Sequence, residues 1–188
     1  MWALVESNNI TQVYTRPKGL TIGDVNYPSN IFMLWSSSEL EAIGIYEVVV
    51  DNTNYKNPEY YINTNQTFAF SSGTVTASYG TATAKAIDDV TDEDDNVTRG
   101  LKWNHKQVIN AQAAGNLSPT DWMVIRAQEG GTAVPSSITT KRAAVRTKAN
   151  AMCTQITNAA NVDALAALYV YNDDTPPVRP LGQLPLVD

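Results

Sequence analysis

The period of the hydrophobic pattern changes across a short acidic run, and this change constrains the fold more than any other feature. Before the run, short apolar segments such as Tyr46–Val50 stand between turn residues, a pattern typical of β-strands. After it, apolar residues recur about every three or four positions, which is typical of helices. Six acidic residues lie between positions 88 and 95 and separate the two patterns. The sequence therefore predicts an α+β chain made of two modules.

The boundaries of the modules follow from the same patterns. We expect a β-rich module over residues 1–86, an acidic linker over 87–98, a helical domain over 99–171 and an extended C-terminal arm over 172–188. A chain of 188 residues is long enough for one large domain or two small ones. Hydrophobic residues make up 43% of the chain and charged residues 17%, so the chain can bury a core and global disorder is excluded.

The β-rich module is predicted to be small and antiparallel, with one short helix. Residues 2–7 and 10–15 have the composition of strands. The pair Asn8-Asn9 between them favours a tight turn, because asparagine tolerates a positive φ. The helix is expected to begin after Ser36, a good N-terminal cap, and to stop at Gly44.

The helical domain is predicted to form a helical hairpin or bundle. Its longest helix opens at Pro135 and runs to about Asn158. The apolar residues of this helix fall on a one-sided stripe with helical spacing, made of Ile138, Val145, Ala149, Met152 and Ile156. A stripe of this kind is typical of a helix that packs along one face against a neighbour.

The C-terminal arm is rich in proline and cannot be helical. Residues 172–188 are therefore expected to be extended, near polyproline II, and able to contact another chain. Because prolines stiffen the arm before it binds, its docking costs little conformational entropy. We predict that the contact residues in this arm are Pro176, Pro177, Arg179, Pro180, Leu181, Leu184, Pro185 and Leu186.

Composition and charge argue against several functional classes. No apolar run approaches the ~20 residues that span a bilayer, so no membrane span is expected. One cysteine and one histidine exclude a disulfide framework and multi-ligand metal sites of the Cys or His type, and we expect no cofactor. Residues 99–160 carry eight basic and two acidic side chains, but these bases are not interleaved with aromatics, and residues 1–98 are strongly acidic. We therefore expect no nucleic-acid partner.

Two groups of residues could carry chemistry, and both are better explained structurally. His105 and Cys153 could form a nucleophile–base pair, but each is expected on a helix without a stabilising donor motif. The run 92–96 begins like a calcium-binding loop, yet Val97 and Trp103 stand where that loop needs its glycine and its final glutamate. The sequence therefore predicts a protein that is not an enzyme.

Two stretches of the chain are distinctive. The first is Tyr27-Pro28-x-Asn30-Ile31-Phe32-x-Leu34-Trp35-Ser36, followed by Glu39-Leu40-x-Ala42-Ile43-Gly44-Ile45-Tyr46-Glu47-Val48. The second is Leu117-Ser118-Pro119-Thr120-Asp121-Trp122-Met123-Val124-Ile125-Arg126, followed by Gly131-Thr132-Ala133-Val134-Pro135 and Arg142-Ala143-Ala144-Val145-Arg146. Together they resemble small tail-fibre and tail-fibre-assembly-like virion proteins of tailed, often marine, bacteriophages. The second stretch is similar to the helical C-terminal domain of tail-fibre assembly proteins.

This resemblance implies a non-enzymatic structural protein located in the virion, in its tail or tail-fibre region. It implies other phage structural proteins as partners, a homo-oligomer, and no catalytic residues. Two alternatives stay open, namely an assembly chaperone that binds the fibre tip and a capsid decoration protein. The proline-rich tail after Asn172 departs from the pattern of the assembly chaperones. A ligand on the host surface would be bound by exposed aromatic residues in loops 51–59 or 63–66.

Overall fold

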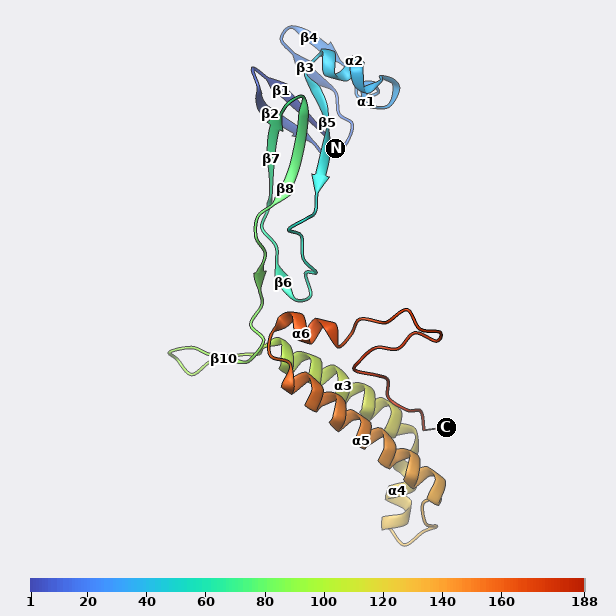
Figure 1. Cartoon of the computed structure of the whole chain (residues 1–188). Coiled ribbons are helices and arrows are strands. Elements are labelled where there is room, and N and C mark those ends of the chain that lie inside the picture. The colour runs from blue at the N-terminus through green and yellow to red at the C-terminus, as the bar shows by residue number, and fades with distance from the viewer. Residues whose placement is uncertain (188) are drawn as a thin grey trace. The chain divides into compact units, whose positions relative to one another are not determined.

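The computed structural model describes residues 1–187 and contains both strands and helices, which confirms the α+β class (Figure 1). The chain divides into two compact units, residues 1–83 and 84–188, here called the N-terminal unit and the C-terminal unit. The acidic segment and the proline-rich tail both belong to the C-terminal unit, where the sequence predicted a separate linker and a separate arm.

A five-stranded sheet with the order β2-β1-β5-β8-β7 forms the centre of the N-terminal unit. Its strands are β1 (Trp2–Glu6), β2 (Asn9–Tyr14), β5 (Ile45–Asp51), β7 (Gln66–Ser71) and β8 (Thr74–Tyr79). The prediction of a purely antiparallel module is wrong, because β5 pairs with β8 in parallel, with Val48 opposite Val75. The chain runs back through β7 before it enters β8, so β8 has the same direction as β5 and lies between β5 and β7.

Short elements complete this unit. The ladders β3–β4 (Leu20–Ile22 and Val25–Tyr27) and β6–β9 (Tyr61–Ile62 and Thr83–Ala84) have two strands each. Of the two short helices, α2 (Ser37–Ala42) is the predicted one, and α1 (Ile31–Leu34) precedes it and was not predicted. Ser36 caps α2 as expected, since its hydroxyl accepts the backbone N–H of Glu39 while the Glu39 carboxylate accepts the backbone N–H of Ser36.

Successive side chains of β1 and β5 point to opposite faces of the sheet, and apolar residues are buried on both faces. One face packs against β3, β4 and the two helices, and the core between them is made of Leu4, Tyr14, Leu20, Ile31, Phe32, Leu40 and Ile45. The other face buries Ala3, Val48, Val75 and Ala77. The edge strands β2 and β7 approach each other to within 8 Å between Cα atoms, so the sheet curls over this second core.

The C-terminal unit is built on two long helices that lie side by side, α3 (Leu101–Leu117) and α5 (Ser136–Asn158) (Figure 1). The turn η1 (Ser118–Thr120) and the helix α4 (Asp121–Gln128) connect them, and α6 (Val162–Ala167) follows α5. Four of the five predicted stripe residues on α5 are buried, namely Val145, Ala149, Met152 and Ile156. Within residues 1–187, no helix combines the length and hydropathy needed to cross a membrane.

A buried arginine also lies on the stripe of α5, which the sequence did not predict. The Arg142 guanidinium donates to the carbonyl oxygen of Leu117 at 2.7 Å, to Thr120 Oγ1 at 2.6 Å and to Asp121 Oδ1 at 2.7 Å. These acceptors lie where α3 ends and α4 begins. Arg142 therefore ties the α3–α4 junction to α5, and its charged group is part of the interior.

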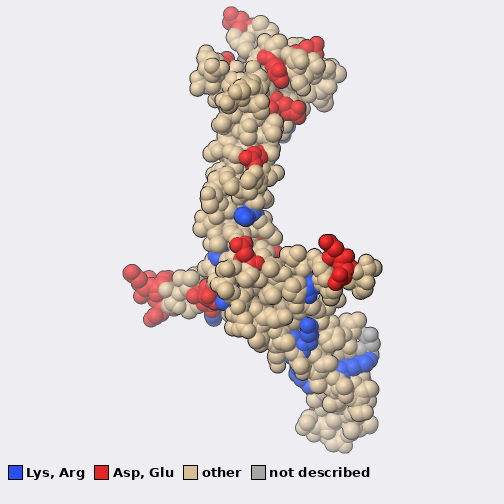
Figure 2. Space-filling model, viewed as in Figure 1, with Lys and Arg blue, Asp and Glu red and all other residues tan. Residues whose placement is uncertain are grey.

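The acidic segment is a folded hairpin. Strands β10 (Val90–Thr91) and β11 (Val97–Thr98) pair antiparallel, and Figure 2 shows acidic side chains gathered on this projection, labelled β10 in Figure 1. At its tip, Asp92 Oδ1 accepts the backbone N–H groups of Asp94 and Asn96, each at 2.9 Å. Local hydrogen bonds of this type favour a turn over an open linker.

The base of the hairpin fixes the start of α3. Asp89 accepts the backbone N–H of Gly100 at 2.8 Å and an Arg99 guanidinium N–H at 2.6 Å. Gly100 is the N-cap residue and has no side chain that could cap α3, so Asp89 satisfies an N-terminal amide in its place. A β-carbon at Gly100 would collide with the carbonyl oxygen of Asp88, which explains why glycine is needed there.

The Asp89 contacts predict a pH dependence. The hydrogen bond from the Gly100 N–H, followed by that from Arg99, holds the pKa of Asp89 below its ordinary value. Asp89 therefore binds a proton more readily in the unfolded chain, and its stabilising contribution is complete above about pH 5. We expect this contribution to be lost as the pH falls through about 3.9 towards the lower native pKa.

An NMR titration of the Gly100 amide signal measures this transition. In the variant Asp89→Asn, which keeps an acceptor oxygen but cannot titrate, the Gly100 signal should not move over the same pH range. A Gly100 signal that titrates equally in both proteins would contradict the assignment.

Candidate interaction surfaces

The C-terminal tail folds back onto its own helices instead of extending as a free arm. Leu181, in the middle of the tail, is 0% exposed, and its N–H donates to the carbonyl oxygen of Leu168 just after α6 at 3.0 Å. The sequence predicted an extended arm over residues 172–188 that contacts another chain, and its central part instead contacts the chain's own helices. Burial of the Leu181 side chain against the helices removes apolar surface from water, and this favours the docked tail over an extended one.

Two side-chain hydrogen bonds hold the tail on either side of Leu181. Gln155 on α5 donates from Nε2 to the carbonyl oxygen of Pro180 at 3.3 Å. Asn116 on α3 donates from Nδ2 to the carbonyl oxygen of Pro185 at 3.1 Å. Pro180 and Pro185 contribute carbonyl acceptors and have no backbone N–H that needs a partner. Their rings also fix φ and so limit the motion of the tail.

The first part of the tail, residues 172–178, is a closed loop. The backbone N–H of Asn172 donates to the carbonyl oxygen of Val178 at 2.8 Å, and the backbone N–H of Val178 donates back to Asn172 Oδ1 at 2.8 Å. Pro176 and Pro177 lie exposed between them. The loop therefore presents prolines to solvent while its ends are fixed.

The eight residues predicted to contact another chain are thus divided by the fold. Those that remain exposed are Pro176, Pro177, Pro180 and Leu186, those half-buried are Arg179, Leu184 and Pro185, and Leu181 is fully buried. Leu181 is unavailable to another chain while the tail is docked. For the other seven residues, contact with a second chain stays a prediction.

Arg179 is the charged residue of the docked tail that lies against aromatic rings. Its guanidinium lies 5.5 Å from the ring centroid of Tyr169 and 5.6 Å from that of Tyr171. Its Nε donates to the carbonyl oxygen of Gly182 at 3.0 Å. The Tyr169 hydroxyl in turn lies 2.8 Å from Nδ1 of the buried His105 on α3. A chain of contacts therefore runs from the interior of the helix pair to the surface of the tail.

His105 and Cys153 have different partners and form no nucleophile–base arrangement in the described contacts. His105 contacts Tyr169, while Cys153 Sγ lies 3.7 Å from Asn110 Oδ1. Burial raises the pKa of the Cys153 thiol, only partly offset by Lys106, so the thiol stays protonated at neutral pH. The described part of the chain holds no group of three His, Cys, Asp or Glu side chains arranged around a possible metal ion.

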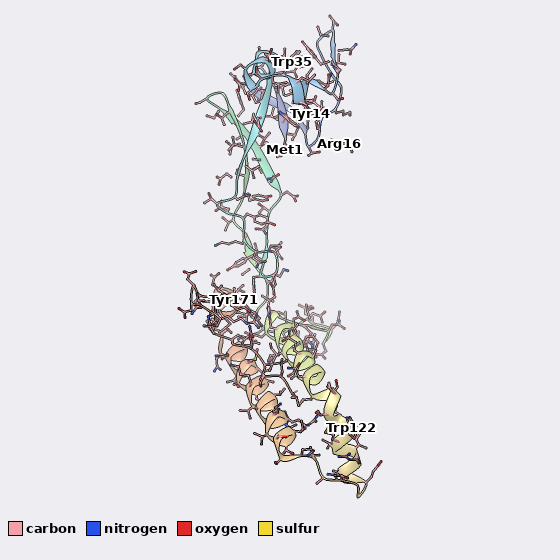
Figure 3. The ribbon with its side chains drawn as sticks, turned by 90° about the vertical axis from the view of Figure 1, so that its right-hand side faces the viewer. Met1, Tyr14, Arg16, Trp35, Trp122 and Tyr171 are labelled. Atoms are coloured by element: carbon pink, nitrogen blue, oxygen red, sulfur yellow. The ribbon has the colours of Figure 1, made fainter. Side chains whose placement is uncertain are left out.

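An exposed apolar cluster lies at the end of α1 in the N-terminal unit. Met33 is 72% exposed and Leu34 is 73% exposed, and both precede Trp35, which is labelled in Figure 3. The Trp35 ring meets that of Tyr27 edge-on at a centroid distance of 5.8 Å. We call Met33, Leu34 and Trp35 the α1 cluster. Leu34 and Trp35 belong to the first distinctive stretch of the sequence, but their exposure was not predicted.

A second exposed apolar cluster lies on α4 in the C-terminal unit. Trp122 is 52% exposed and Ile125 is 58% exposed, and no residue of α4 is buried. Figure 3 places Trp122 at the end of the helix pair, and the Arg126 guanidinium lies 4.9 Å from the Trp122 ring centroid. Trp122 and Ile125 are called the α4 cluster below. Two large apolar side chains that stay exposed on a helix without a buried residue are the signal that points to this surface.

The loops predicted to bear exposed aromatics for a host-surface ligand are residues 51–59 and 63–66. Tyr55 is the aromatic residue of these two ranges, and it is 44% exposed and packs against Tyr79 with ring centroids 4.9 Å apart. Ligand binding by loops 51–59 or 63–66 stays a prediction.

Comparisons of the chain with protein-family models, with curated proteins and with solved structures gave no match.

Proposed function

We propose that this chain is a non-enzymatic structural protein of a tailed-bacteriophage virion, in the tail or tail-fibre region, where it mediates subunit assembly or attachment. The resemblance of residues 27–48 and 117–146 to small phage virion proteins supports this proposal. The observation that carries it is the presence of exposed apolar clusters on two units that each have buried residues of their own. Grouped apolar side chains of this kind are typical of surfaces that bind other proteins.

The two units supply different binding parts in this proposal. The N-terminal β-module offers the α1 cluster, and the C-terminal helical hairpin offers the α4 cluster and the tail loop. Opposite charge is carried by two segments of the sequence rather than by the two units. Residues 1–98, which include the acidic hairpin of the C-terminal unit, carry 13 acidic and 4 basic side chains, whereas residues 99–160 are basic overall. Opposite charge on two parts of the same chain favours ordered packing between copies, and other virion proteins complete the set of partners.

A second candidate function is that of an assembly chaperone that binds the fibre tip. The stretch that resembles the helical domain of assembly proteins, residues 117–146, includes α4, where Trp122 and Ile125 are exposed. Tryptophan is enriched among residues that dominate protein–protein binding energy. The α4 cluster would then be the surface that holds an incomplete fibre.

Quantitative mass spectrometry of purified particles separates the two functions. A structural protein should be present at a fixed ratio to the major capsid protein in every preparation. A chaperone should be depleted from finished particles while it stays abundant in the infected-cell lysate. Absence from both particles and fibre-assembly intermediates would contradict both functions.

Light scattering of the recombinant protein tests the α1 cluster directly. We expect a defined oligomer whose dissociation constant rises about tenfold or more when Met33→Ser and Leu34→Ser are combined. The matched control is Val90→Ser, which also removes an exposed apolar side chain but lies on the acidic hairpin. A monomer at every concentration would contradict self-assembly through this cluster. Deletion of residues 172–188 is not a suitable test, because it removes the buried Leu181 together with the exposed loop.

A further inference from the structure

We infer that Arg179 is the centre of a binding site for a carboxylate joined to an apolar group. The site is a shallow hollow of about 580 Å³ between the end of α6 and the tail. Its walls are Ala167, Val170, Tyr171, Val178 and Pro180, with Arg179 as their charged member and Asn172 beside it. This inference goes beyond the proposed structural role and does not depend on it.

The Arg179 guanidinium is held in place but most of its donors are free. Two tyrosine rings lie against it at 5.5 and 5.6 Å, and Nε donates to Gly182. Arginine has five N–H donors, and among residues 1–187 no acceptor bonds the remaining four. Within the described residues no carboxylate forms an ion pair with Arg179 either. A fixed planar fork with unused donors matches the geometry of a carboxylate.

A second cation strengthens the local positive charge. Lys148 on α5 approaches Gly182 so closely that a β-carbon there would lie 2.5 Å from Nζ. Gly182 has a φ of +74°, which glycine adopts without strain, so this residue allows both the close approach and the turn. The described residues offer no ion-pair partner to Lys148. Two cations therefore flank Gly182 in a segment, residues 161–188, that otherwise carries four acids.

The walls of the hollow select the kind of anion. Val170 and Val178 are exposed apolar side chains, and the ring of Tyr171 is half exposed beside them. An apolar group attached to the carboxylate would cover these side chains, which a free inorganic anion cannot do. Asp173 and Asp174 belong to the same loop and disfavour a doubly charged phosphate. A carboxylate joined to an apolar group fits the site, because its apolar group covers the walls and its single negative charge is repelled less by the two aspartates.

NMR titration of the full chain with sodium benzoate tests the site. We expect the amide signals of Val170, Val178 and Gly182 to shift with one dissociation constant on the order of 1 mM. Sodium phosphate supplies an anion without an apolar group, and benzyl alcohol supplies an aromatic ring without a charge. Neither should reproduce these shifts. Equal shifts with benzyl alcohol, or none with benzoate, would overturn the inference.

Variants show whether Arg179 is responsible. Arg179→Met should weaken benzoate binding about tenfold or more, and Arg179→Lys should weaken it as well, because an ammonium group cannot form the two-pronged contact. The control is Arg146→Met, which removes an exposed arginine of α5 that has no hydrogen-bond partner among the described residues. If Arg179→Met releases the tail, its benzoate affinity cannot be interpreted. The benzoate affinity of the Arg179→Lys protein and the shifts in the unmodified protein then test the site. Unchanged benzoate affinity in the lysine variant, or an equal loss in the Arg146 variant, would overturn the assignment.

The same chemistry can come from a free organic acid or from an acidic side chain beside an apolar residue of a protein. A synthetic peptide of residues 88–97 represents the second source, since it carries carboxylates between Val90 and Val97. Tighter binding of this peptide than of benzoate at Arg179 supports the site and assigns a protein as its ligand. Binding of benzoate alone supports the site and assigns a small acid.

Discussion

Replacement of Leu181 by alanine is expected to lower the free energy of unfolding by about 3 kcal/mol and to release the tail from the helices. Leu181 is fully buried, and truncation of a buried leucine removes its transfer free energy and leaves a cavity. The tail can leave without unfolding α3 and α5, so loss of its docking should precede global unfolding. Chemical denaturation measures the first effect, and hydrogen exchange at the Leu181 amide, which is bonded to Leu168, measures the second.

The matched control for this prediction is Leu186→Ala. Leu186 belongs to the same tail but is 66% exposed, so its truncation should change stability by no more than about 0.5 kcal/mol. If the two variants are equally stable, Leu181 is not an anchor and the tail is not docked in solution.

Replacement of Arg142 by methionine is expected to lower the free energy of unfolding by about 3 kcal/mol. Methionine retains much of the apolar stem but leaves three acceptors at the α3–α4 junction without their donor. Hydrogen bonds from a charged group contribute about 1.5–3 kcal/mol each, and three that share one donor group are not additive. Chemical denaturation monitored by far-UV circular dichroism measures the loss.

A graded series tests the reason for that loss. Asp121→Asn should cost about 1 kcal/mol or less, because Asp121 is half exposed and Arg142 keeps its bonds to Leu117 and Thr120. Arg146→Met, one turn further along α5 and exposed, should be nearly neutral. A loss in Arg146→Met as large as that in Arg142→Met would contradict the role of Arg142 as the tie between the helices.

The Leu181 prediction bears on how the tail can act in an assembly. A docked tail presents Pro176, Pro177 and Leu186 from a fixed base, so contact with a partner does not require the whole segment to become ordered. The Leu181→Ala variant would therefore separate two effects in any assembly assay. If assembly fails while the helices stay folded, the fixed position of the tail matters to the partner.

Much of the candidate surface could not be predicted from the sequence. Prolines and leucines in residues 172–188 predicted contact with a protein surface, and the surface that the structure provides is the chain's own helix pair. Trp122 and Ile125 belong to the second distinctive stretch, but the sequence did not predict that they would be exposed. Coverage depends on which elements pack nearby, and that is a property of the tertiary arrangement.

The sequence by itself determined those features that depend on neighbours along the chain. The cap at Ser36, the bounds of α5 and four buried positions on its stripe all follow from local hydrogen bonding and from helical periodicity. The tertiary structure alone decided the parallel pairing of β5 with β8, the burial of Arg142 and the docking of Leu181. Each of these joins segments far apart in the sequence, and its free energy comes from a packed environment that no local pattern contains.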